Sequence, residues 1–138
     1  MVYQVLYVSH STNDMSQNDL DRLLSISRQN NRENQITGIL MYNAGVFIQL
    51  IEGPPMKVLD LVDHIKKDRR HTNYRALIER TSKTRLYPAW DMKYVANEGV
   101  SREWMNIIVG LNLAVVKDGR KTDIGQFLNS AQLAMSSA

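Results

Sequence analysis

The sequence predicts an α+β protein in which an antiparallel sheet carries two helices on one face. Short runs rich in Val, Ile, Leu and Tyr alternate with longer segments whose apolar residues recur every three or four positions. Their order along the chain is β-α-β-β-α-β-β, which an antiparallel sheet with both helices on one side satisfies. The length of 138 residues suits one domain, because single domains usually run to about 100–200 residues.

The first strand and the first helix are expected within the first 32 residues. Residues 2–9 are rich in Val and Tyr, and both faces of this strand are apolar, as in the centre of a sheet. The following helix should begin after Ser16, whose side chain caps it together with Asp19, and should end near residue 32. Its core-facing stripe begins apolar and ends polar, at Ser27 and Asn31.

A hairpin and a second helix follow. The strands over 36–42 and 46–52 are separated by three residues that end in Gly45, and such loops commonly connect hairpins. The prolines after Gly53 stop the second strand and suit the start of a helix, which we expect to reach about residue 68.

Two further strands, over 74–80 and 90–95, complete a ferredoxin-like sheet. The pattern then changes to two amphipathic helices, one from Ser101 to about residue 115 and one over 122–136.

We therefore divide the chain into a sheet domain, residues 1–97, and a C-terminal helical extension, residues 98–138. Part of the extension should cover the sheet face that the two core helices leave bare.

The composition excludes several kinds of site and location. There is no cysteine, so neither a disulfide framework nor a thiolate metal site can form. No apolar run approaches the ~20 residues that cross a bilayer, and the first residues lack the pattern of a signal peptide. We expect a cytoplasmic protein without membrane contact. The net charge is +3 with its basic residues spread out, so we expect no nucleic-acid partner.

Familiar enzyme signatures are missing from the sequence. It has no Gly-rich phosphate loop, no GxSxG motif and no closely spaced pair of histidines. His10, His64 and His71 are too scattered to predict a metal site. We therefore predict that the chain is neither an enzyme nor a metalloprotein.

Three polar residues, Tyr7, Asn31 and Gln49, lie where apolar ones are expected. Gln49 shares its strand face with Phe47 and Ile51, and a buried amide must find partners for its donors and its acceptor. Each residue alone is most simply structural. Together they indicate a polar slot between the two helices that suits a flat heteroaromatic ligand.

Motifs along the first 97 residues resemble those of a known family. They are Leu6-Tyr7-x-Ser9, Asn30-Asn31, Ile36-Thr37-Gly38-Ile39-Leu40, Phe47-x-Gln49-x-Ile51-Glu52-Gly53, Asp68-x-Arg70-His71 and Trp90-x-Met92. In order and spacing they resemble the BLUF domain, the blue-light sensor using flavin. No single motif is specific, but the separation of Tyr7 from Gln49 combined with the Trp-x-Met pair is.

The resemblance implies a photoreceptor that binds FAD. Tyr7 then matches the photoactive tyrosine, Gln49 the switching glutamine and Asn31 the asparagine that anchors the flavin. Trp90 and Met92 match the pair on the last strand that lies near the glutamine. Further matches at the flavin or beside the glutamine are Ser27, Asn30, His64 and Asp68, and the basic residues that could meet the cofactor's phosphates are Arg28, Lys66, Arg70 and His71.

The resemblance also implies the mechanism. Tyr7 supplies an electron and then a proton, and Gln49 rotates or tautomerises. This changes the hydrogen bonds at flavin N5 and O4 and shifts absorption to the red. We expect the signal to pass through the last strand and the C-terminal helices to a homo-oligomer interface or a separate protein partner.

Two other functions are compatible with such a fold. A ferredoxin-like enzyme of the acylphosphatase type would need an arginine and an asparagine around a phosphate near the first loop, but residues 10–14 contain no arginine. An RNA-binding sheet would need exposed aromatic stacking pairs, which are not evident on the strands. Colour separates these alternatives, because only a flavoprotein purifies yellow.

Overall fold

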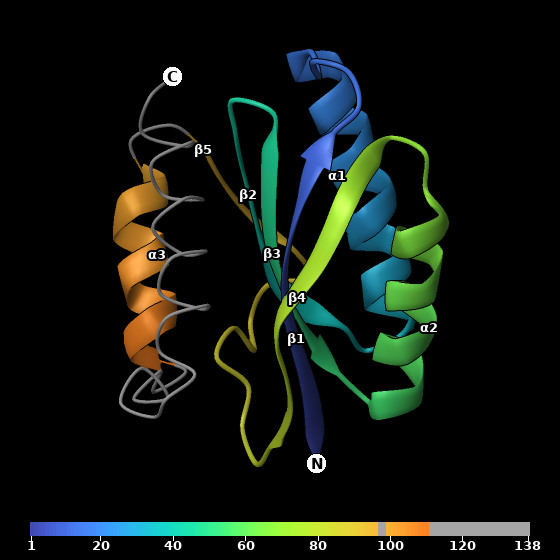
Figure 1. Ribbon diagram of the computed structural model, residues 1–138. Helices are drawn as coiled ribbons and strands as arrows, with labels where there is room; N and C mark the ends of the chain where they lie inside the picture. Colours follow the sequence, from blue (N-terminus) through green and yellow to red (C-terminus); the bar gives the residue numbers. More distant parts are fainter. Residues whose placement is uncertain (97–98, 111–138) are drawn as a thin grey trace.

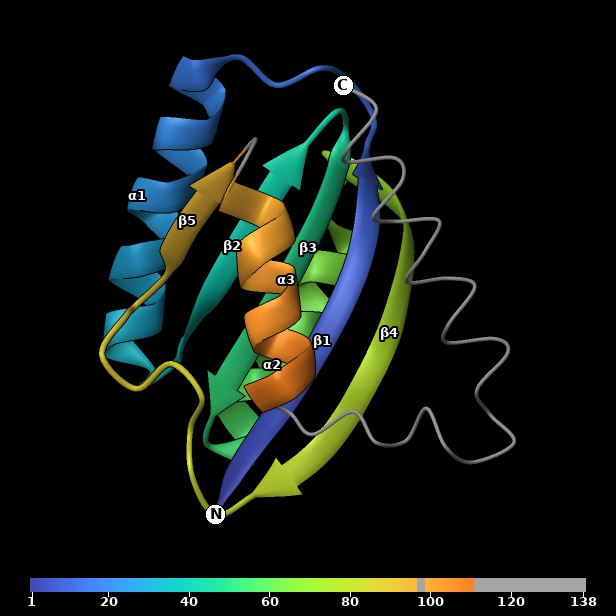
Figure 2. The same cartoon turned by 90° about the vertical axis from the view of Figure 1, so that its left-hand side faces the viewer.

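In the computed structural model, residues 1–96 and 99–110 form a five-stranded sheet with helices on both faces (Figure 1). Helices α1 and α2 cover one face, and α3 lies on the other (Figure 2). The elements are β1 (Val2–Ser11), α1 (Gln17–Glu33), β2 (Thr37–Asn43), β3 (Val46–Gly53), α2 (Pro55–Lys67), β4 (His71–Ser82), β5 (Lys93–Ala96) and α3 (Gly99–Gly110). The helix expected over 122–136 lies outside the described residues.

The strand order is β4-β1-β3-β2-β5. The first four strands pair antiparallel in the ferredoxin-like order, as predicted. The expectation of a wholly antiparallel sheet was wrong for β5, which pairs parallel to β2. The reason is that β4 ends beside Val2 and β5 begins beside Ile39, at the same end of the sheet. The connection runs along that end, where β2 also begins, so the chain turns back into β5 in the same direction as β2.

A buried carboxylate holds this connection against the sheet. Glu52, at the end of β3, is fully buried. It accepts hydrogen bonds from the backbone N–H groups of Leu86 and Tyr87 at 2.6 and 2.8 Å. The side-chain amide of Gln4 donates a third at 2.7 Å. A buried carboxylate is tolerated where such donors satisfy it, so Glu52 positions the chain that leads into β5.

The local signals of α1 are confirmed. The predicted hairpin also forms, but Asn43 pairs with Val46, so its loop consists of Ala44 and Gly45 rather than the expected three residues. The Ser16 side chain accepts from the Asp19 N–H, and the Asp19 side chain accepts from the Ser16 N–H, each at 3.1 Å. In the hairpin, Ala44 and Gly45 have φ angles of 52° and 79°, the left-handed conformation that glycine favours. Several predicted strand bounds were wrong: β1 ends later than residue 9, β4 extends beyond its predicted range at both ends, and β5 begins three residues later than the expected position 90.

Helix α3 covers the second face of the sheet, as predicted. Trp104 and Ile107 are fully buried, and Val100 is nearly so. They pack with sheet residues that include Leu6, Ile39, Ile48 and Leu50. The area beneath α3 is therefore closed to stacked bases, which counts against the RNA-binding alternative.

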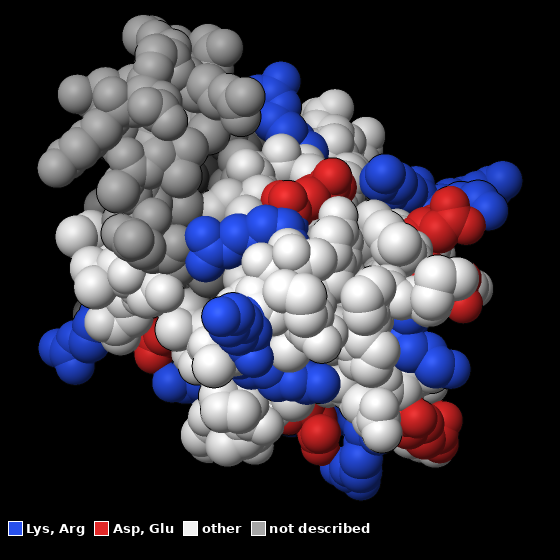
Figure 3. Space-filling view, turned by 90° about the horizontal axis from the view of Figure 1, so that it is seen from below, with Lys and Arg blue, Asp and Glu red and all other residues white. Residues whose placement is uncertain are grey.

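On the face drawn in Figure 3, basic and acidic side chains are interspersed. None of the helices in the described ranges is long and apolar enough to cross a membrane.

Candidate functional site

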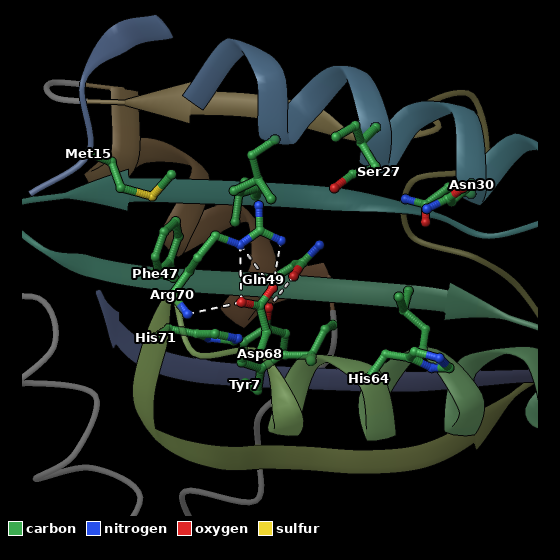
Figure 4. A pocket seen from close by; sticks show the side chains of 16 residues that line it. Tyr7, Met15, Ser27, Asn30, Phe47, Gln49, His64, Asp68, Arg70 and His71 are labelled. Carbon is green, nitrogen blue, oxygen red and sulfur yellow. Dashed lines mark hydrogen bonds and ion pairs between the residues drawn. The ribbon is translucent and has the colours of Figure 1, made fainter. Parts of the chain in front are cut away.

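A cavity of about 200 Å³ lies between α1 and α2, above β1, β2 and β3 (Figure 4). It contains most of the side chains that the sequence singled out. The predicted residues that line it are Tyr7, Ser27, Asn30, Asn31, Gln49, His64, Asp68 and Arg70.

Tyr7, Gln49 and Met92 form a chain of contacts at the base of the cavity. Tyr7 and Gln49 are direct partners across β1 and β3. Adjacent strands thus bring together two residues that are 42 positions apart, and the Tyr7 hydroxyl donates to Gln49 Oε1. Gln49 Nε2 donates to the Met92 sulfur at 3.5 Å. An amide nitrogen carries two hydrogens, so one of them remains for a ligand.

Burial keeps the Tyr7 phenol neutral. Tyr7 is only 3% exposed. This burial, followed by the neighbouring Tyr74 and Asp68, raises the pKa of Tyr7 far above its usual range. The phenol therefore keeps its proton at physiological pH, and that proton already points at the Gln49 carbonyl oxygen.

The α1 side of the cavity carries Ser27, Asn30 and Asn31, three and four positions apart and thus on one helix face. Asn31 is 2% exposed, and its Nδ2 donates to the Asp91 carbonyl at 2.7 Å. Its second N–H and its Oδ1 remain for a ligand in the cavity.

The α2 side and its C-terminal end carry His64, Asp68 and Arg70. His64 Nδ1 donates to the Asp60 carbonyl at 2.8 Å, since a carbonyl can only accept, and Nε2 is then the acceptor of the neutral ring. Arg70 Nη2 lies 2.5 Å from Asp68 Oδ2 in an ion pair at the cavity. The hydrogen bond from Arg70 is the main cause that lowers the pKa of Asp68. His71 also lines the cavity, with Nδ1 2.8 Å from Ser9 Oγ.

The placement predicted for Trp90 was wrong. Met92 is 1% exposed and contacts Gln49, whereas Trp90 is 52% exposed and does not line the cavity. The prediction assumed that positions 90 and 92 lie on one face of a strand. β5 begins only at Lys93, so strand alternation does not apply there.

Two of the basic residues considered for phosphates do not line the cavity either. Arg28 Nε donates to the Met92 carbonyl at 3.0 Å. The Lys66 ammonium lies 5.2 Å from the centre of the Tyr74 ring. Arg70 and His71 are the two of this group that face the cavity.

Sequence reasoning missed the apolar walls of the cavity: Met15, Leu23, Ile26, Leu40, Phe47, Leu61 and Ile65. One signal could have indicated them. Ile26 precedes Asn30 by one helical turn, and Leu61 and Ile65 flank His64, so each helix combines apolar and polar residues along one stripe. Ile26 is 52% exposed, and the cavity explains this exposed apolar side chain.

The arrangement suits a planar ligand with hydrogen-bonding groups along one edge. Apolar side chains supply the walls, and the free groups of Gln49, Asn31 and His64 supply both donors and acceptors. The part of the chain that the structure describes contains no cluster of three or more potential metal ligands.

Comparison with known proteins agrees with this geometry. The model of the BLUF family, described as sensors of blue light using FAD, matches residues 2–93. This chain belongs to the BLUF family. It is accordingly a blue-light sensor, and BLUF domains bind flavin.

Relatives of this BLUF chain differ greatly in length. The photoactivated adenylate cyclase subunit beta of Euglena gracilis is 32% identical over 93 residues, which are 67% of this chain but only 11% of that protein. The dark-state structure of BlrB, a BLUF protein, is 27% identical, with a TM-score of 0.71 over 94% of this chain and 96% of BlrB. Klebsiella pneumoniae BlrP1, solved with FMN and cyclic diGMP, is 25% identical, with a TM-score of 0.69 over 94% of this chain and 35% of BlrP1.

This chain spans about a tenth of the Euglena cyclase subunit but nearly all of BlrB. Small-molecule sites usually measure roughly 300–1,000 Å³, so a cavity of about 200 Å³ is too small to enclose a whole dinucleotide such as FAD.

Proposed function

We propose that this chain binds FAD between α1 and α2 and senses blue light through Tyr7 and Gln49. The observation that carries the proposal is the hydrogen bond from the Tyr7 hydroxyl to Gln49 Oε1 at the base of the cavity. Asn31, Asn30 and His64 would hold the edge of the flavin ring. Ser27, Asp68 and Arg70 complete the polar lining.

Bound flavin supplies the absorption of blue light and a strongly oxidising excited state. Tyr7 is the electron donor of the chain. When its ring loses an electron, the phenol becomes a strong acid, and its proton moves along the existing hydrogen bond to Gln49 Oε1. The raised pKa of Tyr7 means that this proton is present before every excitation.

Gln49 is the switch because its amide has two different ends. With Oε1 toward Tyr7, Nε2 faces the Met92 sulfur. Rotation or tautomerisation changes which groups of the amide donate and accept at these contacts. It thereby changes the hydrogen-bonding groups that the amide presents to a ligand in the cavity. The sulfur is a weak acceptor, so the contact that must be broken costs little.

The proposal is tested by a light-minus-dark absorption spectrum of the purified protein. We expect a yellow protein whose flavin band moves reversibly to the red under blue light. Flavin released by denaturation should be FAD by mass. A colourless protein, or a yellow one without the reversible shift, would contradict the proposal, whereas FMN alone would overturn only the choice of cofactor.

We further propose that residues 1–97 are the sensor and residues 98–138 the output. A polar junction supports this division: Lys93 Nζ lies 2.9 Å from Glu103 Oε1, and the Tyr87 hydroxyl donates to Glu103 Oε2 at 2.9 Å. Lys93 follows Met92 directly, so α3 is tied to the residue next to the Gln49 contact. Light would then change the affinity of the chain for its own copies or for a separate protein partner. The expected change is about 5–150-fold, which corresponds to ~1–3 kcal/mol.

Met92→Ala tests this route. We expect the variant to keep the red shift and to lose the light-dependent change in association or in hydrogen exchange over residues 100–136. Without the Met92 side chain, a rearranged Gln49 has no partner on the chain that leads to α3. Met56→Ala is the control, because Met56 lies on α2 and is 77% exposed. A Met92→Ala protein whose extension still responds as in the parent would show that the signal takes another path.

A further inference from the structure

The chain just before β5 is held by three hydrogen bonds to three consecutive carbonyl groups. The Gly38 N–H donates to the Trp90 carbonyl at 3.0 Å. Asn31 Nδ2 donates to the Asp91 carbonyl at 2.7 Å, and Arg28 Nε donates to the Met92 carbonyl at 3.0 Å. The ladder between β2 and β5 begins only at Lys93. Two side chains of α1 therefore hold residues 91 and 92, where regular strand pairing has not yet begun.

These two side chains lie on one face of α1, because Arg28 and Asn31 are three residues apart. They differ in one respect that separates their roles. Asn31 is 2% exposed and lines the cavity, so it is positioned to contact a ligand as well. Arg28 does not line the cavity, and its Nε donates to the Met92 carbonyl.

Arg32, one turn further along α1, also reaches this segment but in another way. Its Nε lies 3.1 Å from the Asp91 side chain, in an ion pair whose side chains are 71% and 36% exposed. Exposed ion pairs of this kind contribute little to stability, and this one involves the Asp91 side chain rather than the backbone of Met92. Arg32 is therefore a matched comparison for Arg28.

The position of Met92 matters because its contact with Gln49 is weak. The sulfur is a poor acceptor at 3.5 Å from Gln49 Nε2, so this contact alone does not hold either side chain in place. The hydrogen bond from the charged Arg28 side chain to the Met92 carbonyl is stronger, since hydrogen bonds that involve a charged group exceed neutral ones in strength. It fixes the backbone from which the sulfur reaches Gln49.

We propose that Arg28 is a positioning residue of the photocycle: by holding the Met92 carbonyl, it keeps the Met92 sulfur against Gln49 and so sets the lifetime of the light-adapted state. This inference rests on the proposed function of Gln49 as the switch. Return to the dark state re-forms the contact between Nε2 and the sulfur. If Met92 is displaced, its contact with Gln49 stabilises the transition state of this return less, so recovery slows.

The test is the rate of thermal recovery after a blue flash, measured on the flavin-loaded full chain. We expect Arg28→Met, which keeps a helix-forming residue but removes the donor, to slow recovery by about threefold or more. Arg28→Lys, which keeps a donor, should restore most of the parent rate. Arg32→Met should stay within about 1.5-fold of the parent, as expected for an exposed pair.

A double-mutant cycle separates positioning from a general loosening of α1. In the Met92→Ala background the sulfur is absent, so Arg28→Met should have no further effect on recovery. An Arg28→Met protein that recovers at the parent rate would overturn the inference, and so would an effect that persists undiminished in Met92→Ala. Should Arg28→Met fail to retain flavin, Arg28→Leu carries the same expectations. A parent chain without a reversible red shift would instead contradict the proposed function.

Discussion

A Gln49→Leu protein should bind flavin and show no reversible red shift under blue light. Leucine keeps the bulk at the base of the cavity but can neither accept from the Tyr7 hydroxyl nor donate to Met92. The Tyr7 proton then loses its acceptor, and no amide remains to exchange its ends. Flavin absorption should be compared before and after illumination, with flavin content measured on the same sample.

Gln17→Leu is the matched control, because Gln17 lies exposed at the start of α1 and its amide donates to the Asp21 carboxylate at 2.8 Å. It should keep the full shift. Gln49→Glu provides a second comparison, since an ionised carboxylate can accept but not donate and cannot rearrange without a proton. A folded Gln49→Leu protein with a normal shift would refute the proposed switch.

The proximity of Tyr7 and Gln49 could be predicted from the sequence because the order of the first elements is typical of a ferredoxin-like sheet, in which β1 and β3 are neighbours. The elements themselves have short-range signals, namely strand periodicity, the hairpin with Gly45 and the capping box at Ser16. Once β1 and β3 are neighbours, their register brings the two residues together.

The environment of Trp90 could not be predicted in the same way, because it depends on contacts between distant segments. The sequence suggests a strand over 90–95, but α1 side chains and the Gly38 N–H hold the carbonyls before Lys93. The β2 position that holds the Trp90 carbonyl requires glycine, since a Cβ atom at Gly38 would lie 2.0 Å from the Leu50 carbonyl oxygen on the neighbouring β3. Strand alternation alone contains none of this information.

The direction of β5 was missed for a similar reason. Its parallel pairing depends on the path of the connection, and that path is fixed by the buried Glu52 carboxylate 34 and 35 positions earlier than Leu86 and Tyr87. A glutamate that follows an apolar strand usually indicates the end of that strand. Its partners become apparent only when the backbone N–H groups of a remote segment are in place.

A Tyr7→Phe protein should bind flavin about as well as the parent but form the red-shifted product at least about tenfold more slowly, equivalent to ~1.4 kcal/mol on the barrier. Because this slower step competes with decay of the excited flavin, the product yield should fall. The ring still packs in its place beside Tyr74, at a centroid distance of 4.8 Å in the parent. What is lost is the hydroxyl proton aimed at Gln49 Oε1. Time-resolved spectra should then show excited flavin decaying without the normal product.

Neither Tyr74 nor Trp90 is placed to replace Tyr7. Among the described residues, the Tyr74 hydroxyl is buried without a hydrogen-bond partner, and burial raises its pKa to about 12, so an oxidised Tyr74 has no acceptor for its proton. Trp90 is 52% exposed and outside the cavity, so it can quench excited flavin at most from a distance. Tyr74→Phe is therefore the control and should leave the product yield unchanged. An unchanged yield in Tyr7→Phe, or a yield that falls equally in Tyr74→Phe, would show that Tyr7 is not the productive donor.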